Sequence, residues 1–77
     1  MQECFSNRLI YAMSLHNIKI SDLSYLTGIR KAKIKQYLND LREPKSQAIR
    51  DIALVLNVSE DWLMGLDVPM ERSGTIH

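Results

Sequence analysis

The chain has 77 residues, 45% of them hydrophobic and 25% charged, and its formal net charge is +1. This length and composition predict a single globular domain and exclude a disordered or fibrous chain. The sequence holds a single cysteine and no apolar run long enough to cross a bilayer, so we expect a cytoplasmic protein with neither disulfides nor a membrane partner.

The periodicity of apolar residues predicts five helices and an all-α fold. The first helix is expected at about 3–16, with Arg8 on its outer face and Asn17 at its end. The second is expected at 21–27. Gly28 follows it and favours a turn, because glycine adopts the left-handed conformation that ends many helices.

The third helix is expected within 28–39, where the sequence reads GIRKAKIKQYLN. A loop with Pro44 follows, because proline disfavours helical geometry in the residue before it. The fourth helix is expected at 46–57, where apolar residues have the clearest helical period. Ser46 is the expected cap of its first turn.

The fifth helix is expected within 58–65, with Ser59 as its cap. Trp62 falls at a core-facing position, so we expect it to pack in the core rather than stack on a base. The sequence that follows has no periodicity. We therefore expect a domain at 1–66 and a tail, or the start of a linker, at 67–77.

Charge is concentrated around the third helix. Residues 30–45 contain six cationic and two acidic residues, a local charge of +4, so all other positions sum to −3. At helical spacing, one side of this helix is apolar, with Ile34, Tyr37, Leu38 and Leu41. The opposite stripe contains Lys31, Ala32, Lys35, Gln36 and Asn39, flanked by Arg30 and Lys33.

A cationic stripe is often only a solvated helix face, but the composition of this one favours a nucleic acid partner. Carboxamides can pair with adenine, lysine can bind guanine or phosphate, and a small alanine can contact a thymine methyl group. The stripe contains no acid that would balance its lysines by pairing one helical turn away. We therefore expect double-stranded DNA as the partner.

The segment 22–44, DLSYLTGIRKAKIKQYLNDLREP, resembles the lambda-repressor-like (Cro/XRE-type) helix-turn-helix family. The shared positions are Leu23, Ser24, Gly28, Ile29, Ile34, Tyr37 and a proline after the third helix. The resemblance covers about 5–66 and implies a five-helix DNA-binding domain whose third helix enters the major groove.

The stretch 58–70 is further similar to the end of the DNA-binding domain in phage-type repressors. In such repressors a linker and a self-associating domain often follow. The resemblance therefore leaves two expectations open for this chain. It is either a stand-alone small regulator or the N-terminal part of a longer repressor.

The resemblance also implies roles for individual residues. Three residues match positions that usually contact base edges: Lys31, Ala32 and Gln36. Asn39 matches a position near the DNA backbone. Two residues of the following loop match phosphate contacts, Arg42 and Lys45.

Three positions depart from the family pattern. Ile20 stands where many members place a glutamine that contacts phosphate, so the resemblance does not carry that contact over to this chain. Lys19 and Arg30 replace capping residues of the second and third helices, so the second helix is expected to begin nearer Ser21.

No constellation in the sequence predicts catalysis. A nucleophile with a nearby base and a glycine-rich phosphate loop are both missing. Cys4, His16 and His77 match no zinc-ligand spacing, and Cys4 is expected to be a small apolar helix residue. We expect no enzyme, no cofactor, no metal and no small-molecule substrate.

The sequence thus predicts a sequence-specific transcriptional regulator, with a repressor that occupies an operator as the favoured form. The alternative is a protein-interaction module of the same fold, antitoxin-like or anti-regulator, in which DNA binding is secondary. One recognition helix covers few base pairs, so we expect a weak homodimer or a dimer formed on DNA. Apolar residues in 64–70, with Leu26, are the expected contact.

Overall fold

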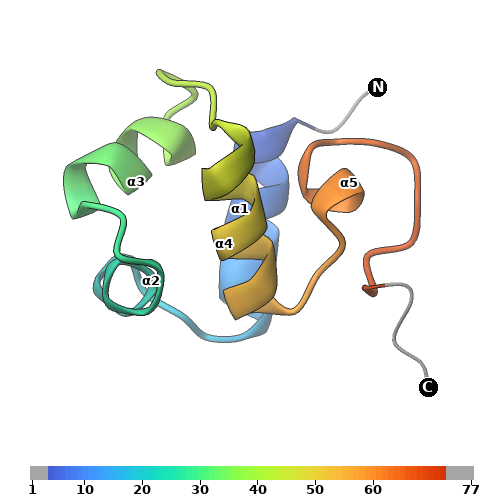
Figure 1. The fold of residues 1–77 in the computed structure, drawn as a ribbon, viewed down its shortest axis with the longest axis horizontal. Helices are drawn as coiled ribbons and strands as arrows, with labels where there is room; N and C mark the ends of the chain where they lie inside the picture. Colours follow the sequence, from blue (N-terminus) through green and yellow to red (C-terminus); the bar gives the residue numbers. More distant parts are fainter. Residues whose placement is uncertain (1–3, 73–77) are drawn as a thin grey trace.

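The computed structural model describes residues 4–72, and these contain five helices and no strand. The helices are α1 (Phe5–Leu15), α2 (Ile20–Thr27), α3 (Lys31–Leu38), α4 (Ser46–Leu56) and α5 (Glu60–Leu63). In Figure 1, α1 and α4 lie at the centre, with α2 and α3 at one end and α5 at the other. The expected all-α, five-helix fold is confirmed.

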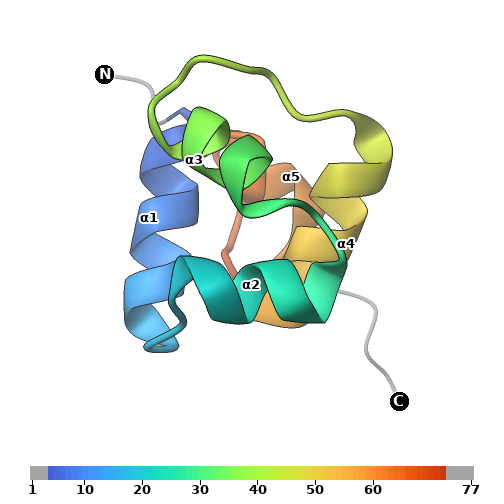
Figure 2. The same ribbon diagram turned by 90° about the vertical axis from the view of Figure 1, so that its left-hand side faces the viewer.

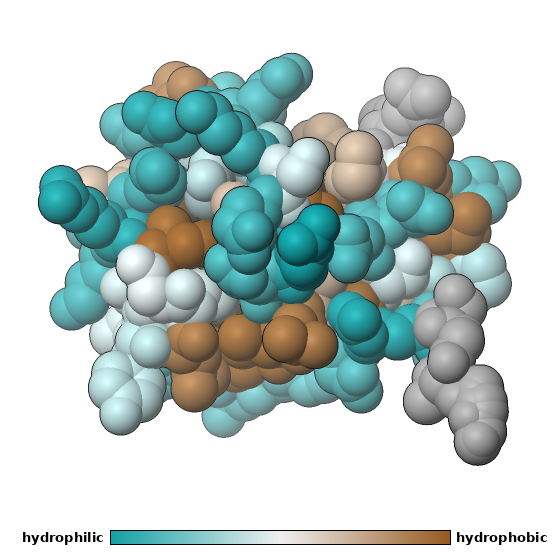
Figure 3. Space-filling model, in the orientation of Figure 1, coloured by the Kyte–Doolittle hydropathy of each residue, from teal (hydrophilic) through white to brown (hydrophobic). Residues whose placement is uncertain are grey.

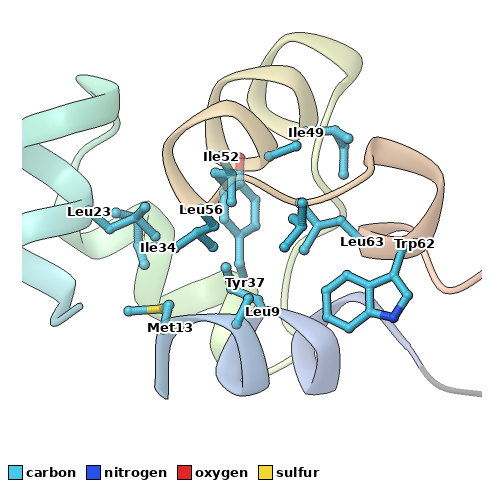
Figure 4. Packing of buried hydrophobic residues seen from close by; sticks show 13 residues of the cluster. Leu9, Met13, Leu23, Ile34, Tyr37, Ile49, Ile52, Leu56, Trp62 and Leu63 are labelled. Atoms are coloured by element: carbon cyan, nitrogen blue, oxygen red, sulfur yellow. The ribbon is translucent and has the colours of Figure 1, made fainter. Parts of the chain in front are cut away.

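The core forms where all five helices meet. Its buried apolar residues are Leu9, Ala12, Met13, Leu23, Ile34, Tyr37, Ile49, Ile52, Ala53, Leu56, Val58, Trp62 and Leu63. Figure 4 shows these side chains converging from the different helices. Burying a large apolar side chain contributes about 1.5–3 kcal/mol to folding. The apolar faces predicted from periodicity are therefore the faces that pack.

Residues with positive φ end several helices and turn the chain sharply. Asn17, after α1, has a φ of 55°, and the N–H of Ile18 donates to the Met13 carbonyl at 2.8 Å. Asp40 and Asn57 do the same after α3 and α4, with φ of 60° and 56°. Asparagine and aspartate tolerate this conformation better than other non-glycine residues. The turns satisfy helix carbonyls that otherwise lack a donor.

Arg8 does not lie on an outer face of α1, which corrects the expectation from periodicity. Its guanidinium carbon is 4.7 Å from the centroid of the Trp62 ring, and Nη1 donates to the Trp62 carbonyl at 2.9 Å. The reason is tertiary, because α5 packs against this side of α1. Trp62 is 8% exposed, so its predicted packing role is confirmed.

The helix starts differ from expectation in two places. Lys45 keeps an extended ψ of 167°, so α4 becomes helical only at Ser46, and Ser46 is its first helical residue rather than its cap. Likewise α2 begins at Ile20 and not nearer Ser21, because Asp22 Oδ2 accepts the Lys19 backbone N–H at 3.1 Å. Ser59 caps α5 as predicted, its Oγ accepting the Trp62 N–H at 3.2 Å.

Cys4 precedes α1 in an extended conformation and is not a helix residue, contrary to expectation. Its Sγ lies 3.1 Å from Ser6 Oγ, close to the first turn of the helix. Hydrogen bonding with Ser6, and then with the Asn7 backbone, lowers the pKa of the Cys4 thiol. The thiol is thus hydrogen-bonded before the helix begins, rather than placed on an apolar helix face.

The chain after α5 returns along the domain. The Ser59 N–H donates to the Met70 carbonyl at 2.8 Å, and Met70 packs against the core. Arg72 Nη1 donates to the Val58 carbonyl at 3.2 Å. Residues 67–72, the first part of the expected tail, are thus held by hydrogen bonds, while 73–77 lie outside the described residues.

Candidate nucleic-acid interface

The turn between α2 and α3 is rigidly built. Gly28 has a φ of 79°, and its N–H donates to the Ser24 carbonyl at 2.8 Å, as predicted for a helix-ending glycine. Ser24 Oγ donates to the Ile29 carbonyl at 2.6 Å. The Ile29 N–H donates to Thr27 Oγ1 at 3.1 Å. Figure 2 shows α3 beside α2 after this turn, the arrangement of a helix-turn-helix.

One side of α3 is anchored in the core. Ile34 and Tyr37 are 0% and 3% exposed, and the Tyr37 ring meets Phe5 edge-on with 5.6 Å between centroids. Leu38 is half-buried and packs against the same core. These contacts fix the rotation of α3 about its own axis. The opposite side must then face outward.

Leu41 is an exception to the predicted apolar side, because 75% of it is exposed. The helix ends at Leu38, and Asp40 then takes a φ of 60°. The change of direction carries Leu41 away from the core. Helical spacing therefore gave a wrong prediction for this residue.

The polar stripe of α3 is fully outward-facing. Every residue assigned to it or its flanks is exposed: Arg30, Lys31, Ala32, Lys33, Lys35, Gln36 and Asn39. The two loop cations, Arg42 and Lys45, are also exposed. Figure 3 shows a mainly hydrophilic surface over α3 and the loop that follows it. The predicted site residues thus all lie on α3, beside its ends or in the loop that follows it, and all of them are exposed.

The cations of this face are almost entirely unneutralised. Within residues 4–72, no side-chain hydrogen bond or ion pair involves any of five cations: Arg30, Lys31, Lys33, Lys35 and Lys45. The exception is Arg42, whose Nε donates to Gln36 Oε1 at 2.9 Å. Repulsion among clustered cations is unfavourable, and a polyanion in contact with the face would relieve it.

The Arg42–Gln36 contact could not be predicted from helical spacing. The two residues are six positions apart, beyond the three or four that face each other on a helix. The available signal was Asn39–Asp40, a pair of residue types that tolerate a left-handed turn. Such a turn brings the loop back over the helix.

The start of α2 contributes less to this face than in the family pattern. Ile20 is half-buried and packs against the core. An apolar side chain in that position offers no donor to a phosphate group. The structure therefore agrees with the departure from the family pattern seen at this position in the sequence.

Metal-ligand clusters and membrane-spanning helices are not found among the described residues. In 4–72, no three histidine, cysteine or acidic side chains lie close enough to hold a metal, and His77 lies outside this range. No helix of the described part is both long and apolar enough to span a membrane. A hollow of about 490 Å³ lies against the loop after α3, between Cys4, Pro44 and Met64.

Comparison with known proteins agrees with this geometry. Residues 8–67 match the family described as Cro/C1-type HTH DNA-binding domain. A search of the curated proteins found no relative of this sequence. The family match spans most of the chain and contains α2, the glycine turn and α3. The exposed cationic helix and the match together show that the chain belongs to the Cro/C1-type HTH DNA-binding domain family, and with it to the DNA-binding regulators.

Proposed function

We propose that this protein is a sequence-specific repressor that binds duplex DNA with α3 in the major groove. The observation that carries the proposal is the outward face of α3. It combines unneutralised cations with carboxamides, while the opposite face holds the helix rigidly in the core. By occupying an operator, the protein would exclude polymerase without any cofactor or small-molecule ligand.

The residues of this face have different roles in the proposal. Lys31, Ala32 and Gln36 contact base edges in the major groove. Asn39 lies near the sugar-phosphate backbone. The remaining cations, among them Arg30, Lys33, Lys35 and Lys45, bind or attract phosphates, which supplies affinity and orientation but no direct sequence information.

Selection from a pool of random duplexes tests this function. The wild-type protein should enrich one short sequence, and the logarithm of its affinity should fall linearly with the logarithm of salt concentration. Gln36→Ala should relax the preference at one base pair by about 1–3 kcal/mol. Lys45→Ala should lower the affinity for all duplexes equally and reduce the slope of log affinity against log salt concentration by about one.

The same selection separates the proposal from a protein-interaction module of the same fold. A contact with a protein that is mainly apolar would depend weakly on salt. Failure to enrich any duplex, together with salt-independent binding to a protein partner, would contradict the repressor proposal. Enrichment with a steep salt dependence would contradict the alternative.

We further propose that two copies bind one operator, on half-sites about one helical turn apart. The proposed contact is the segment 64–68, where Met64, Leu66 and Val68 are 56%, 50% and 38% exposed. Met70 packs against the core of its own chain, so it is less available for this purpose. Leu26, on α2, is 55% exposed and is the second candidate.

Charge substitutions test this contact without removing the hydrogen bonds of the C-terminal segment. Leu66→Glu should abolish cooperative binding of the second copy on an operator, as measured by sedimentation with and without DNA. Leu54→Glu is the matched control, because Leu54 is 64% exposed but lies on α4. Unchanged cooperativity in Leu66→Glu would exclude this segment as the contact.

A further inference from the structure

The Arg42–Gln36 hydrogen bond is produced by the end of α3. The N–H of Leu41 donates to the Gln36 carbonyl at 2.8 Å, and the N–H of Asp40 donates to the Tyr37 carbonyl at 3.2 Å. With Asp40 at a φ of 60°, these bonds turn the chain back over the last turn of the helix. Arg42 thereby reaches the outer face and places Nε 2.9 Å from Gln36 Oε1.

The chemistry of this pair determines which end of the carboxamide faces Arg42. A guanidinium carries only donors, so its partner must be the carboxamide oxygen and never the NH₂ group. A glutamine without such a partner rotates about a broad terminal torsion and can exchange its donor and acceptor positions. With Arg42 in contact, the exchanged orientation would set donors against donors.

A fixed orientation matters for base recognition. Adenine is read by a carboxamide that accepts from N6 and donates to N7 at the same time, so donor and acceptor must occupy defined places. Gln36 Oε1 keeps a second lone pair when it accepts from Arg42. The oriented group can therefore still accept from one base atom while its NH₂ group donates to another.

We propose that Arg42 is a positioning residue that sets the base preference of Gln36 by fixing the orientation of its carboxamide. The proposal rests on the proposed DNA-binding function of α3. It changes the role of Arg42 from the phosphate contact implied by family resemblance to a residue that acts on sequence specificity through Gln36. Arg42 differs in this from Lys45, which has no side-chain hydrogen bond or ion pair within residues 4–72.

Four variants test the proposal in a random-duplex selection: Gln36→Ala, Arg42→Ala, the double variant and Lys45→Ala. Gln36→Ala should lose about tenfold or more of the preference at one base pair. Arg42→Ala should broaden the preference at that same base pair. In the Gln36→Ala background, Arg42→Ala should leave the base profile unchanged, because the carboxamide that Arg42 orients is absent. Lys45→Ala, the matched control, should leave every base preference as in the wild type.

Several outcomes would overturn the proposal while the DNA-binding function stands. These are an unchanged base profile in Arg42→Ala, a change confined to a different base pair, or a further change of profile in the double variant. If the wild-type protein enriches no duplex at all, the proposed function is refuted, and the role of Arg42 with it.

A measurement without DNA checks the contact itself. In the free protein, the NMR resonances of the Gln36 side-chain amide should shift in Arg42→Ala and stay in place in Lys45→Ala. Both residues are exposed, so neither substitution should unfold the domain, and circular dichroism verifies this. Gln36 amide resonances that do not respond to Arg42→Ala would overturn the proposal.

Discussion

Helices α3 and α4 both bury an apolar face in the same core, but their outer faces are built differently. On α4, Gln47 Nε2 donates to Asp51 Oδ1 at 2.9 Å, so polar groups one turn apart satisfy each other. On α3 the outer face has three lysines and no acid. Its one side-chain hydrogen bond within residues 4–72 involves a residue from the loop, Arg42.

From this difference we expect that the charge of α3 is not needed for folding. Core packing requires the inner faces of both helices. The outer face of α4 has polar groups that hydrogen-bond to each other, and such a face is compatible with the same fold. The lysines of α3 repel one another instead, at a small cost in stability. Folding and binding should therefore be separable on α3, by substitutions on its two sides.

Removing the inner anchor of α3 should have the largest effect. Ile34 is completely buried, and Ile34→Ala should lower the free energy of unfolding by about 2–5 kcal/mol through lost burial and the cavity left behind. Chemical denaturation measures this free energy of unfolding. Lys35→Ala, the matched control on the outer face, should change it by less than about 0.5 kcal/mol. Equal effects of the two substitutions would contradict the expectation that only the inner face of α3 is needed for folding.

The turn that orients α3 should have the next largest effect. Gly28→Val should lower the free energy of unfolding by more than about 1 kcal/mol, because a β-branched residue is strained at its φ of 79°. Apart from the two neighbouring residues in the chain, nothing lies within 4 Å of an added Cβ, so the cost comes from the backbone conformation rather than a clash.

Asparagine at the same position provides the control. Gly28→Asn should cost clearly less than Gly28→Val, because α4 already ends with a left-handed asparagine, Asn57, at a φ of 56°. Thermal unfolding of both variants compares the two. If valine and asparagine have the same effect, backbone strain is not the reason for this glycine.

A matched pair of cations tests the outer faces directly. Lys35→Ala on α3 should weaken binding to all duplexes a fewfold and reduce the salt slope by about one. Arg50→Ala removes an exposed cation from α4 and should leave both quantities near their wild-type values. Titrations at several salt concentrations measure them. A larger effect of Arg50→Ala than of Lys35→Ala would indicate that DNA binds at the outer face of α4 rather than of α3.

The smallest expected effect concerns Tyr37, on the inner side of α3. Burial raises the pKa of this phenol above 10, and the nearby Arg42 opposes the shift only in part. Above pH 10 the unfolded chain releases this proton first, so stability falls as the pH rises through the pKa of the folded state. In Tyr37→Phe, this contribution to the loss of stability at alkaline pH should be absent. The control is Tyr25→Phe, which changes a tyrosine that is 87% exposed and should keep the wild-type pH dependence. Denaturation at pH 9–11 compares the three proteins.

The sequence by itself determined the helices, the core and the polar stripe of α3. Apolar spacing of three and four residues reports directly which side of a helix is buried, and the burial of Ile34 and Ile52 follows it. Gly28 was equally readable, because few other residues accept its backbone conformation. These features depend on residues that are close together in the chain, so they can be predicted from the sequence.

The tertiary structure decided the contacts that join distant or non-helical residues. Arg8 lies on Trp62 because α5 packs against α1, although the two residues are 54 positions apart. Leu41 is exposed and Arg42 reaches Gln36 because Asp40 reverses the chain two residues after α3 ends, whereas helical spacing had placed Leu41 on the apolar side. Periodicity extends a helix beyond its end, whereas the direction of the chain after a left-handed residue depends on the hydrogen bonds that the folded turn can form.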